Sequence, residues 1–98
     1  MKTTNYKKTE KLLKEMVIYE KILEIREEEN TRKLMDNINK AMECLTDLEK
    51  KIITDFYINN LTMYEISLEI QLTREYTSKV KTAAIRKMEH VLFGKDAA

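Results

Sequence analysis

The side chains best suited to binding chemistry lie close together near the end of this 98-residue sequence. Between Thr73 and Met88, five basic residues stand with one acidic residue, Glu75. The basic residues are Arg74, Lys79, Lys81, Arg86 and Lys87. Guanidinium and ammonium groups donate hydrogen bonds to guanine and attract phosphates, and a carboxylate accepts a hydrogen bond from cytosine. This segment therefore predicts a surface that contacts nucleic acid.

On a helix, these side chains fall into two groups. Four polar residues occupy the first two turns, the end that enters the major groove, and we expect them to contact bases: Arg74, Glu75, Ser78 and Lys79. Lys81, Arg86 and Lys87 lie farther along and are expected to bind phosphates. Tyr76 is a candidate for contact with a thymine methyl group or the DNA backbone. A basic run is more often a plain solvated face, so this pattern alone does not establish DNA binding.

The sequence offers no comparable set of residues for catalysis or for a metal. Cys44 has no second cysteine and no histidine near it in sequence, and His90 has no ligand partner at a suitable spacing. One glycine, Gly94, leaves no glycine-rich loop for a phosphate group. We expect no enzyme activity, no metal and no cofactor. His90 is expected on the surface, and Cys44 is expected to be buried beside the apolar face of its helix.

The elements that position the basic segment are predicted to be helices. With one glycine and no proline, the chain lacks the residues of hairpin turns, so we expect an all-α fold of about five helices. Thr62 and Glu65 form a capping box that starts a short helix, which has about two turns before Gln71. Thr73 can cap a longer, basic helix that ends near Gly94. Two helices joined by so short a turn form a helix-turn-helix, whose second helix enters the major groove.

The inner positions of this predicted helix-turn-helix are apolar or small. We expect them to fill the angle between its two helices: Ile66, Ile70, Leu72, Thr77, Val80 and Ala84. Ser67 is small enough for the helices to cross closely. The inner face of the last helix is predicted to continue through Met88 to Val91.

Three helices are predicted ahead of this unit. A long amphipathic helix is expected from about residue 6 to residue 29, and a second from about residue 32 to residue 45. A third begins at a capping box formed by Thr46 and Glu49, and ends at the pair Asn59-Asn60.

The first helix carries a seam of apolar residues at coiled-coil spacing, which ends after about two heptads: Leu12, Met16, Tyr19 and Leu23. Packing on the core is the favoured interpretation of this seam. The helix is also expected to contact a second copy of the chain, as a homodimer, or another protein, and the same four residues are assigned to that partner surface. We divide the chain into the N-terminal helix (residues 1–31), the helix-turn-helix domain (residues 32–94) and a frayed tail (residues 95–98).

The stretch from about Ile38 to Leu92 resembles region 4 of the sigma-70 family of transcription factors. It matches, in order and spacing, the family's leucine-rich helix, its Thr-x-x-Glu-Ile helix start, its Ser/Thr-Arg-Glu recognition start and its Ala-Leu-x-Lys-Leu tail. The matching stretches are Leu45…Leu48-Glu49-Lys50-Lys51-Ile52-Ile53, Leu61-Thr62-Met63-Tyr64-Glu65-Ile66, Leu72-Thr73-Arg74-Glu75 and Ala84-Ile85-Arg86-Lys87-Met88. The sequence departs from the family at four positions: Ser67 replaces alanine, Gln71 replaces the turn glycine or aspartate, and Tyr76 and Ser78 stand where the family often has arginine.

The resemblance implies a DNA-binding transcriptional regulator. It gives the base contacts to Arg74, Glu75, Ser78 and Lys79, at the upstream element of promoters. Thr62 and the early recognition-helix residues Thr73 and Tyr76 would touch phosphates. The resemblance also implies RNA polymerase as a partner, which is the other protein expected to contact the first helix.

Complete sigma factors have a separate domain that melts promoter DNA, and 98 residues are too few to contain it. We therefore expect this chain not to initiate transcription alone. With a region-4-like unit behind a helical extension, this chain resembles small phage and mobile-element transcriptional regulators, including late-gene activators.

The net charge of +1 gives no information about partners, because 18 basic residues nearly balance 17 acidic ones. A near-neutral charge and the cluster Glu27-Glu28-Glu29 favour an alternative of another class: a protein-binding adaptor or anti-activator that binds polymerase or another regulator without DNA. A single cysteine and the lack of a membrane span or signal pattern predict a reducing, cytoplasmic setting.

Overall fold

The computed structural model describes residues 3–94, and within this range every regular element is helical. The predicted all-α fold is therefore confirmed. The elements are α1 (Thr4–Ile25), α2 (Glu29–Glu43), α3 (Asp47–Ile53), the π-helical turn η1 (Thr54–Ile58), α4 (Met63–Ile70) and α5 (Arg74–Phe93). The frayed tail expected at residues 95–98 lies outside the described residues, and the domain boundary after residue 31 stays a prediction.

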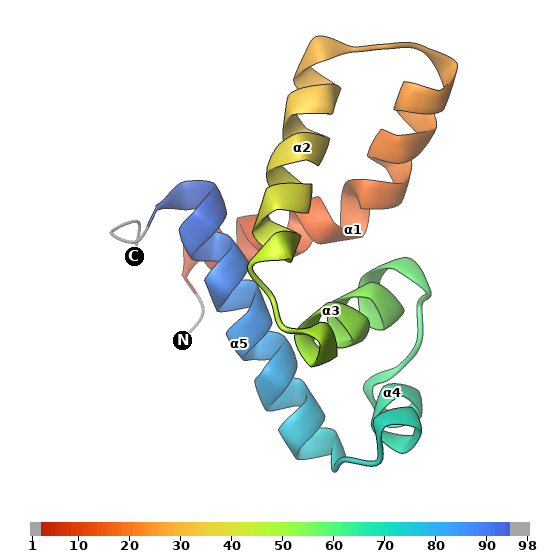
Figure 1. Ribbon diagram of the computed structural model, residues 1–98, viewed down its shortest axis with the longest axis vertical. Coiled ribbons are helices and arrows are strands. Elements are labelled where there is room, and N and C mark those ends of the chain that lie inside the picture. Colours follow the sequence, from red (N-terminus) through yellow and green to blue (C-terminus); the bar gives the residue numbers. More distant parts are fainter. Residues whose placement is uncertain (1–2, 95–98) are drawn as a thin grey trace.

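The helices form two arms joined by α5 (Figure 1). α1 and α2 lie side by side and antiparallel, and a short loop joins them at the top of the view. α3, η1 and α4 lie on the other side of the molecule, and α5 runs along them with α4 at its N-terminal end. This arrangement leaves the start of α5 at one end of the molecule (Figure 1).

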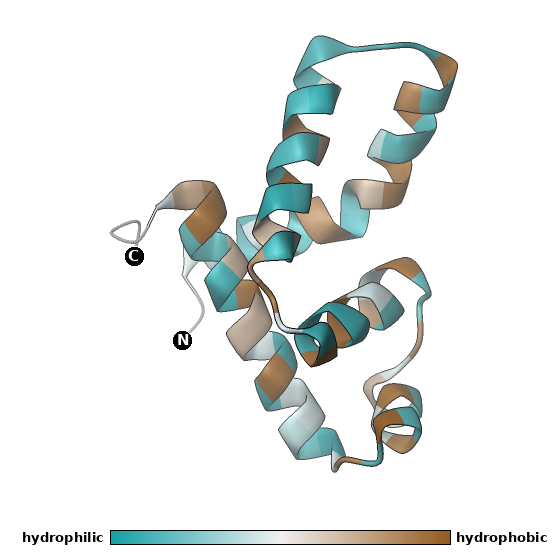
Figure 2. Cartoon of the chain, viewed as in Figure 1, coloured by the Kyte–Doolittle hydropathy of each residue, from teal (hydrophilic) through white to brown (hydrophobic). Residues whose placement is uncertain are grey.

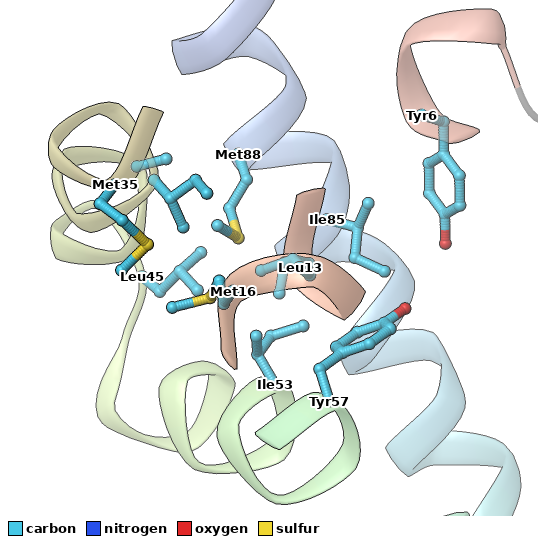
Figure 3. Packing of buried hydrophobic residues seen from close by; sticks show 12 residues of the cluster. Tyr6, Leu13, Met16, Met35, Leu45, Ile53, Tyr57, Ile85 and Met88 are labelled. Carbon is cyan, nitrogen blue, oxygen red and sulfur yellow. The ribbon is translucent and has the colours of Figure 1, made fainter. Parts of the chain in front are cut away.

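One core joins all the helices except α4 (Figure 3). The buried apolar side chains at its centre are Tyr6, Leu13, Met16, Met35, Ile38, Ala41, Leu45, Ile53, Tyr57, Ala84, Ile85 and Met88. Because α1 contributes Tyr6, Leu13 and Met16, it packs on the same chain as part of this core. Burial of such side chains is the main stabilising contribution to a domain of this size.

The apolar seam of α1 faces this core. Met16 is buried, and Leu12, Tyr19 and Leu23 are partly buried and pack against the core. The alternative interpretation of this seam as a partner surface is therefore wrong for Met16, whose side chain is only 4% exposed. The favoured interpretation, packing on the core, is confirmed.

The turn between α1 and α2 comes earlier than predicted. α1 ends at Ile25 and α2 begins at Glu29, because residue Arg26 adopts an extended conformation with φ −156° and ψ 149°. Local polar contacts stabilise this turn: the Thr31 hydroxyl donates to the Glu28 carboxylate at 2.6 Å, and Arg26 lies 3.8 Å from the same carboxylate. Side chains that bond to nearby groups in this way compete with helix formation.

Two predicted burials are wrong. Cys44 is the C-cap residue of α2 and its thiol is exposed, whereas the core residues on either side of it are Ala41 and Leu45. Val91 is 46% exposed, because the inner face of α5 continues from Met88 to Leu92, four residues on, rather than three. His90 is exposed, as predicted.

Candidate nucleic-acid interface

The predicted helix-turn-helix consists of α4, the turn at residues 71–73, and α5. Both capping boxes that the sequence predicts are present. At the start of α4, the Thr62 hydroxyl accepts a hydrogen bond from the amide of Glu65 at 3.1 Å, and the Glu65 carboxylate accepts one from the amide of Thr62 at 3.0 Å. Thr46 and Glu49 do the same at the start of α3. These reciprocal bonds fix where both helices begin.

The turn forms without glycine. Gln71 adopts the left-handed conformation, with φ 59° and ψ 40°. Its amide donates to the carbonyl of Leu68 at 3.3 Å, and the amide of Leu72 donates to the carbonyl of Ser67 at 3.1 Å. This is the Schellman pattern, which satisfies the last carbonyls of α4. A non-glycine residue in this conformation is disfavoured by sterics, so the turn stores strain at Gln71.

A lysine bridge holds α4 against the preceding helices. The Lys51 ammonium donates to Glu69 of α4 at 2.6 Å and to Asp55 of η1 at 3.1 Å. The hydrogen bond to Glu69 and then that to Asp55 raise the pKa of Lys51 above its ordinary value. The amine therefore stays charged, and the bridge helps to set the position of α4 relative to α3 and η1.

A second bridge holds α5 against α3. The buried carboxylate of Glu49 accepts a hydrogen bond from the Thr46 amide at 2.8 Å and from the Lys87 ammonium at 2.9 Å. Burial alone would raise the pKa of Glu49, but the hydrogen bonds from Lys87 and Thr46 outweigh it and lower the pKa below its ordinary value. Glu49 is therefore ionised at neutral pH, and the bridge is a charge-assisted contact within the fold.

Three of the four predicted base-contacting residues are fully accessible at the start of α5. Arg74, Glu75 and Lys79 are exposed, and Ser78 is half-buried. Thr73 fixes this end of the helix, because its hydroxyl accepts a hydrogen bond from the Tyr76 amide at 3.1 Å. The arrangement places donors and an acceptor on the first two turns of one helix, where the edges of bases are reached in the major groove.

The side chains predicted to bind phosphates differ in how accessible they are. Thr62 and Thr73 are exposed caps, each of which uses its oxygen as an acceptor and keeps a hydroxyl proton to donate. Tyr76 is 51% exposed. Arg86 is exposed, and its guanidinium lies 5.6 Å from the centre of the Tyr6 ring. These four side chains are accessible to a ligand.

Lys81 does not lie on the exposed surface that was predicted for it. Its side chain is only 13% exposed, with the ammonium 4.0 Å from Glu10 and 4.5 Å from the centre of the Phe56 ring. The ammonium therefore faces α1 and η1 rather than solvent. The sequence held a signal for this: Lys81 lies four residues after Thr77, on the buried side of α5. Lys87 is half-exposed, but its ammonium is already bound to Glu49.

The predicted inner residues of the helix-turn-helix are mostly enclosed. Ile66, Thr77 and Ala84 are fully buried, whereas Ile70 and Val80 are half-buried. Leu72 is 37% exposed, so the prediction that it is an inner residue of this unit is wrong. The turn carries Leu72 to the outer rim of the unit.

One feature of α4 was missed in the sequence. Tyr64 and Leu68 are 59% and 60% exposed, and α4 is strongly hydrophobic in Figure 2. Their spacing of four residues, out of phase with Ile66 and Ile70, is the signal for an outward apolar pair. The outer side of α4 therefore carries apolar surface next to the start of α5.

The part of the chain that the structure describes contains neither a membrane-spanning helix nor a metal cluster. None of its helices is long and apolar enough to cross a membrane. In the same residues, no group of three or more histidine, cysteine, aspartate or glutamate side chains gathers as a metal site.

Residues 41–90 match the profile of the family described as sigma-70, region 4. No curated protein and no solved structure matches the chain significantly. The match includes α3, η1, α4 and nearly all of α5, so it covers the capping boxes, the turn and the exposed start of α5. Since the match covers half of the sequence, the chain belongs to the sigma-70 region 4 family, whose domain is a non-catalytic, DNA-binding helix-turn-helix connected with transcription.

Proposed function

We propose that this chain regulates transcription by binding duplex DNA through the major groove, with the N-terminal turns of α5 as the recognition element. The observation that carries the proposal is the exposed polar group at the start of α5. There Arg74, Glu75 and Lys79 extend from a helix end that is held in place from three sides: the Thr73 cap, the turn and the α4 helix.

In this proposal the bases are contacted by Arg74, Glu75, Ser78 and Lys79. Arg74 suits guanine, because a guanidinium offers two donors to the acceptors of one base edge. Glu75 suits cytosine as an acceptor. None of these side chains takes part in an ion pair among residues 3–94, so binding DNA breaks no contact within the fold.

The phosphate contacts are assigned to Thr62, Thr73, Tyr76 and Arg86. The first two lie at the starts of α4 and α5, so both helix ends of the unit meet the backbone. Helix N-termini add favourable partial charge toward phosphate. Lys81 and Lys87 are left out of this set, because their ammonium groups are engaged within the fold.

RNA polymerase is proposed as the protein partner, in keeping with the family and with a regulator of the phage or mobile-element kind. The exposed pair Tyr64 and Leu68 on α4 supports a protein contact beside the DNA. Aromatic side chains at the surface are typical of such interfaces.

Binding-site selection with the wild-type protein, repeated with Arg74→Ala, tests the base contacts. We expect the variant to lose affinity and to relax the preference at one position of the site by about 1 to 3 kcal/mol. Lys40→Ala is the matched control, because Lys40 is exposed on α2, outside the helix-turn-helix, and should leave the preference unchanged. If Arg74→Ala lowers the affinity for every DNA sequence equally, the assignment of a base contact to Arg74 is refuted.

The second candidate function is a protein-binding adaptor without DNA. The exposed apolar pair Tyr64 and Leu68 and the acidic turn at residues 27–29 favour it. Binding to RNA polymerase in the absence of any duplex, combined with no detectable binding to DNA at low salt, would select this function over the first.

A further inference from the structure

Among residues 3–94, the lysines in the first half of α1 have no acidic partners. Elsewhere in residues 3–94, ion pairs engage most cations: Lys21, Arg26, Arg32, Lys33, Lys51, Lys81 and Lys87. Lys7, Lys11 and Lys14 are all exposed, and within the described residues no carboxylate oxygen lies within 4.0 Å of them. Spaced by four and three residues, these three side chains share one side of the helix, which we call the α1 lysine face.

This distribution of charge opposes the stability of α1 itself. A helix carries partial positive charge at its N-terminus and partial negative charge at its C-terminus. α1 has no acidic residue in its first turn and no basic residue in its last. Lys7 and Lys11 also repel each other at a spacing of four residues. Because local stability favours the reverse arrangement, the lysine face is best matched by a polyanionic partner.

The start of α1 lies against the C-terminal half of α5. The Thr3 hydroxyl donates to Glu89 at 2.6 Å, and the Arg86 guanidinium lies over the ring of Tyr6. The N-terminal end of α1, where the lysine face begins, therefore packs against α5 near Arg86 and Glu89. In Figure 1, α1 starts on the side of α5 that faces away from α3 and α4.

We propose that Lys7, Lys11 and Lys14 bind phosphates of duplex DNA that flank the bases contacted by α5. The inference rests on the proposed function of α5 and adds a second anchor to it. A lysine ammonium is a hydrated point charge on a flexible stem, which suits a backbone of phosphates without a fixed hydrogen-bonding geometry. The acidic turn at residues 27–29 lies at the other end of α1, so the charge along this helix turns its basic half toward DNA.

The test compares two triple variants that remove the same charge. One is Lys7→Gln, Lys11→Gln and Lys14→Gln. The control is Lys21→Gln, Lys33→Gln and Lys40→Gln, three exposed lysines of the second half of α1 and of α2. Fluorescence anisotropy on one mixed-sequence duplex gives the slope of the logarithm of affinity against the logarithm of salt concentration. A third protein, with arginine at positions 7, 11 and 14, retains the charge.

We expect the lysine-face variant to have a slope shallower by roughly 2 to 3, because each neutralised phosphate contributes about 0.9. Its affinity at about 100 mM salt should fall roughly a hundredfold. The control and the arginine variant should match the wild type. The melting temperature of the lysine-face variant should equal or exceed that of the wild type, because Lys7 opposes the helix dipole and repels Lys11.

Three results would overturn the inference. Equal slopes for the lysine-face variant and the control, with salt-dependent binding by the wild type, would reject it and leave the function of α5 standing. A wild-type protein that binds no duplex would reject both. A wild-type dimer that the lysine-face variant converts to monomer in sedimentation, with DNA binding unchanged, would assign the face to a second copy of the chain.

Discussion

The bridge between Glu49 and Lys87 gives a prediction that separates a role in folding from a role in binding. Lys87→Met removes the ammonium 2.9 Å from the buried Glu49 carboxylate but retains much of the side-chain length. The carboxylate then keeps its contacts with Thr46, whose amide donates to it at 2.8 Å, but no cation. A hydrogen bond to a charged group contributes about 1.5 to 3 kcal/mol, and the half-exposed lysine places this pair toward the lower end.

We therefore expect Lys87→Met to lower the free energy of unfolding by about 2 kcal/mol at pH 7. For a domain of this size that corresponds to a fall of about 10 °C in melting temperature. Urea unfolding followed by circular dichroism measures the loss. Lys40→Met is the matched control, since Lys40 is exposed and has no ion pair among the described residues, and its loss should stay below about 0.5 kcal/mol.

The loss should depend on pH in a defined direction. The pKa of Glu49 is lowered in the folded chain, so the bridge stabilises the fold above the ordinary pKa of glutamate, and this contribution is lost as the pH falls through the folded pKa. Wild type and variant should therefore converge below about pH 4. A variant as stable as the wild type at pH 7, with a DNA salt slope shallower by about 0.9, would refute the reasoning and return Lys87 to the phosphate contacts.

Three further outcomes follow from the described contacts. Gln71→Gly should stabilise the chain by about 0.5 to 1 kcal/mol, because glycine adopts the left-handed conformation without steric cost, and a destabilised variant in urea unfolding would contradict the strain assigned to the turn. Leu13→Ala should cost about 2 to 5 kcal/mol in the same assay, whereas Ile25→Ala, at a side chain that is 80% exposed, should cost less than about 0.5 kcal/mol. Lys81→Met should leave the salt slope of DNA binding unchanged; a slope shallower by about 0.9 would show that Lys81 contacts a phosphate after all.

The sequence predicted best what depends on a few neighbouring residues. Both capping boxes and the Thr73 cap are present where expected, because each is set by hydrogen bonds over three residues. The turn between α1 and α2 was predicted too late in the sequence. The run Glu27-Glu28-Glu29 suits a helix by propensity, but the contacts of the Glu28 carboxylate with Arg26 and Thr31 stabilise a turn there.

The orientation of individual cations could not be predicted from the basic run alone. Lys81 and Arg86 stand in the same run, yet one faces Glu10 and the Phe56 ring while the other is exposed. Which lysine turns inward depends on α1 and η1, which are distant in sequence. The helical phase from Thr77 was the available signal, and a count of charges does not contain it.

The separation of charge along α1 was also missed, for a different reason. A net charge of +1 averages the exposed lysines of its first half with the carboxylates near its end. In the fold, the start of α1 packs against α5 near Arg86, and the acidic turn lies at the far end of the same helix. Local charge on a surface, rather than net charge, determines which ligand approaches it.

The central claim, that α5 binds duplex DNA, is tested most directly by anisotropy of the wild-type protein on a mixed-sequence duplex across a salt series that starts near 20 mM. We expect binding with a log-log slope of roughly −3 to −5, which corresponds to three to five neutralised phosphates. Flat anisotropy at the lowest salt would contradict the account and favour a protein-binding function for this helix-turn-helix.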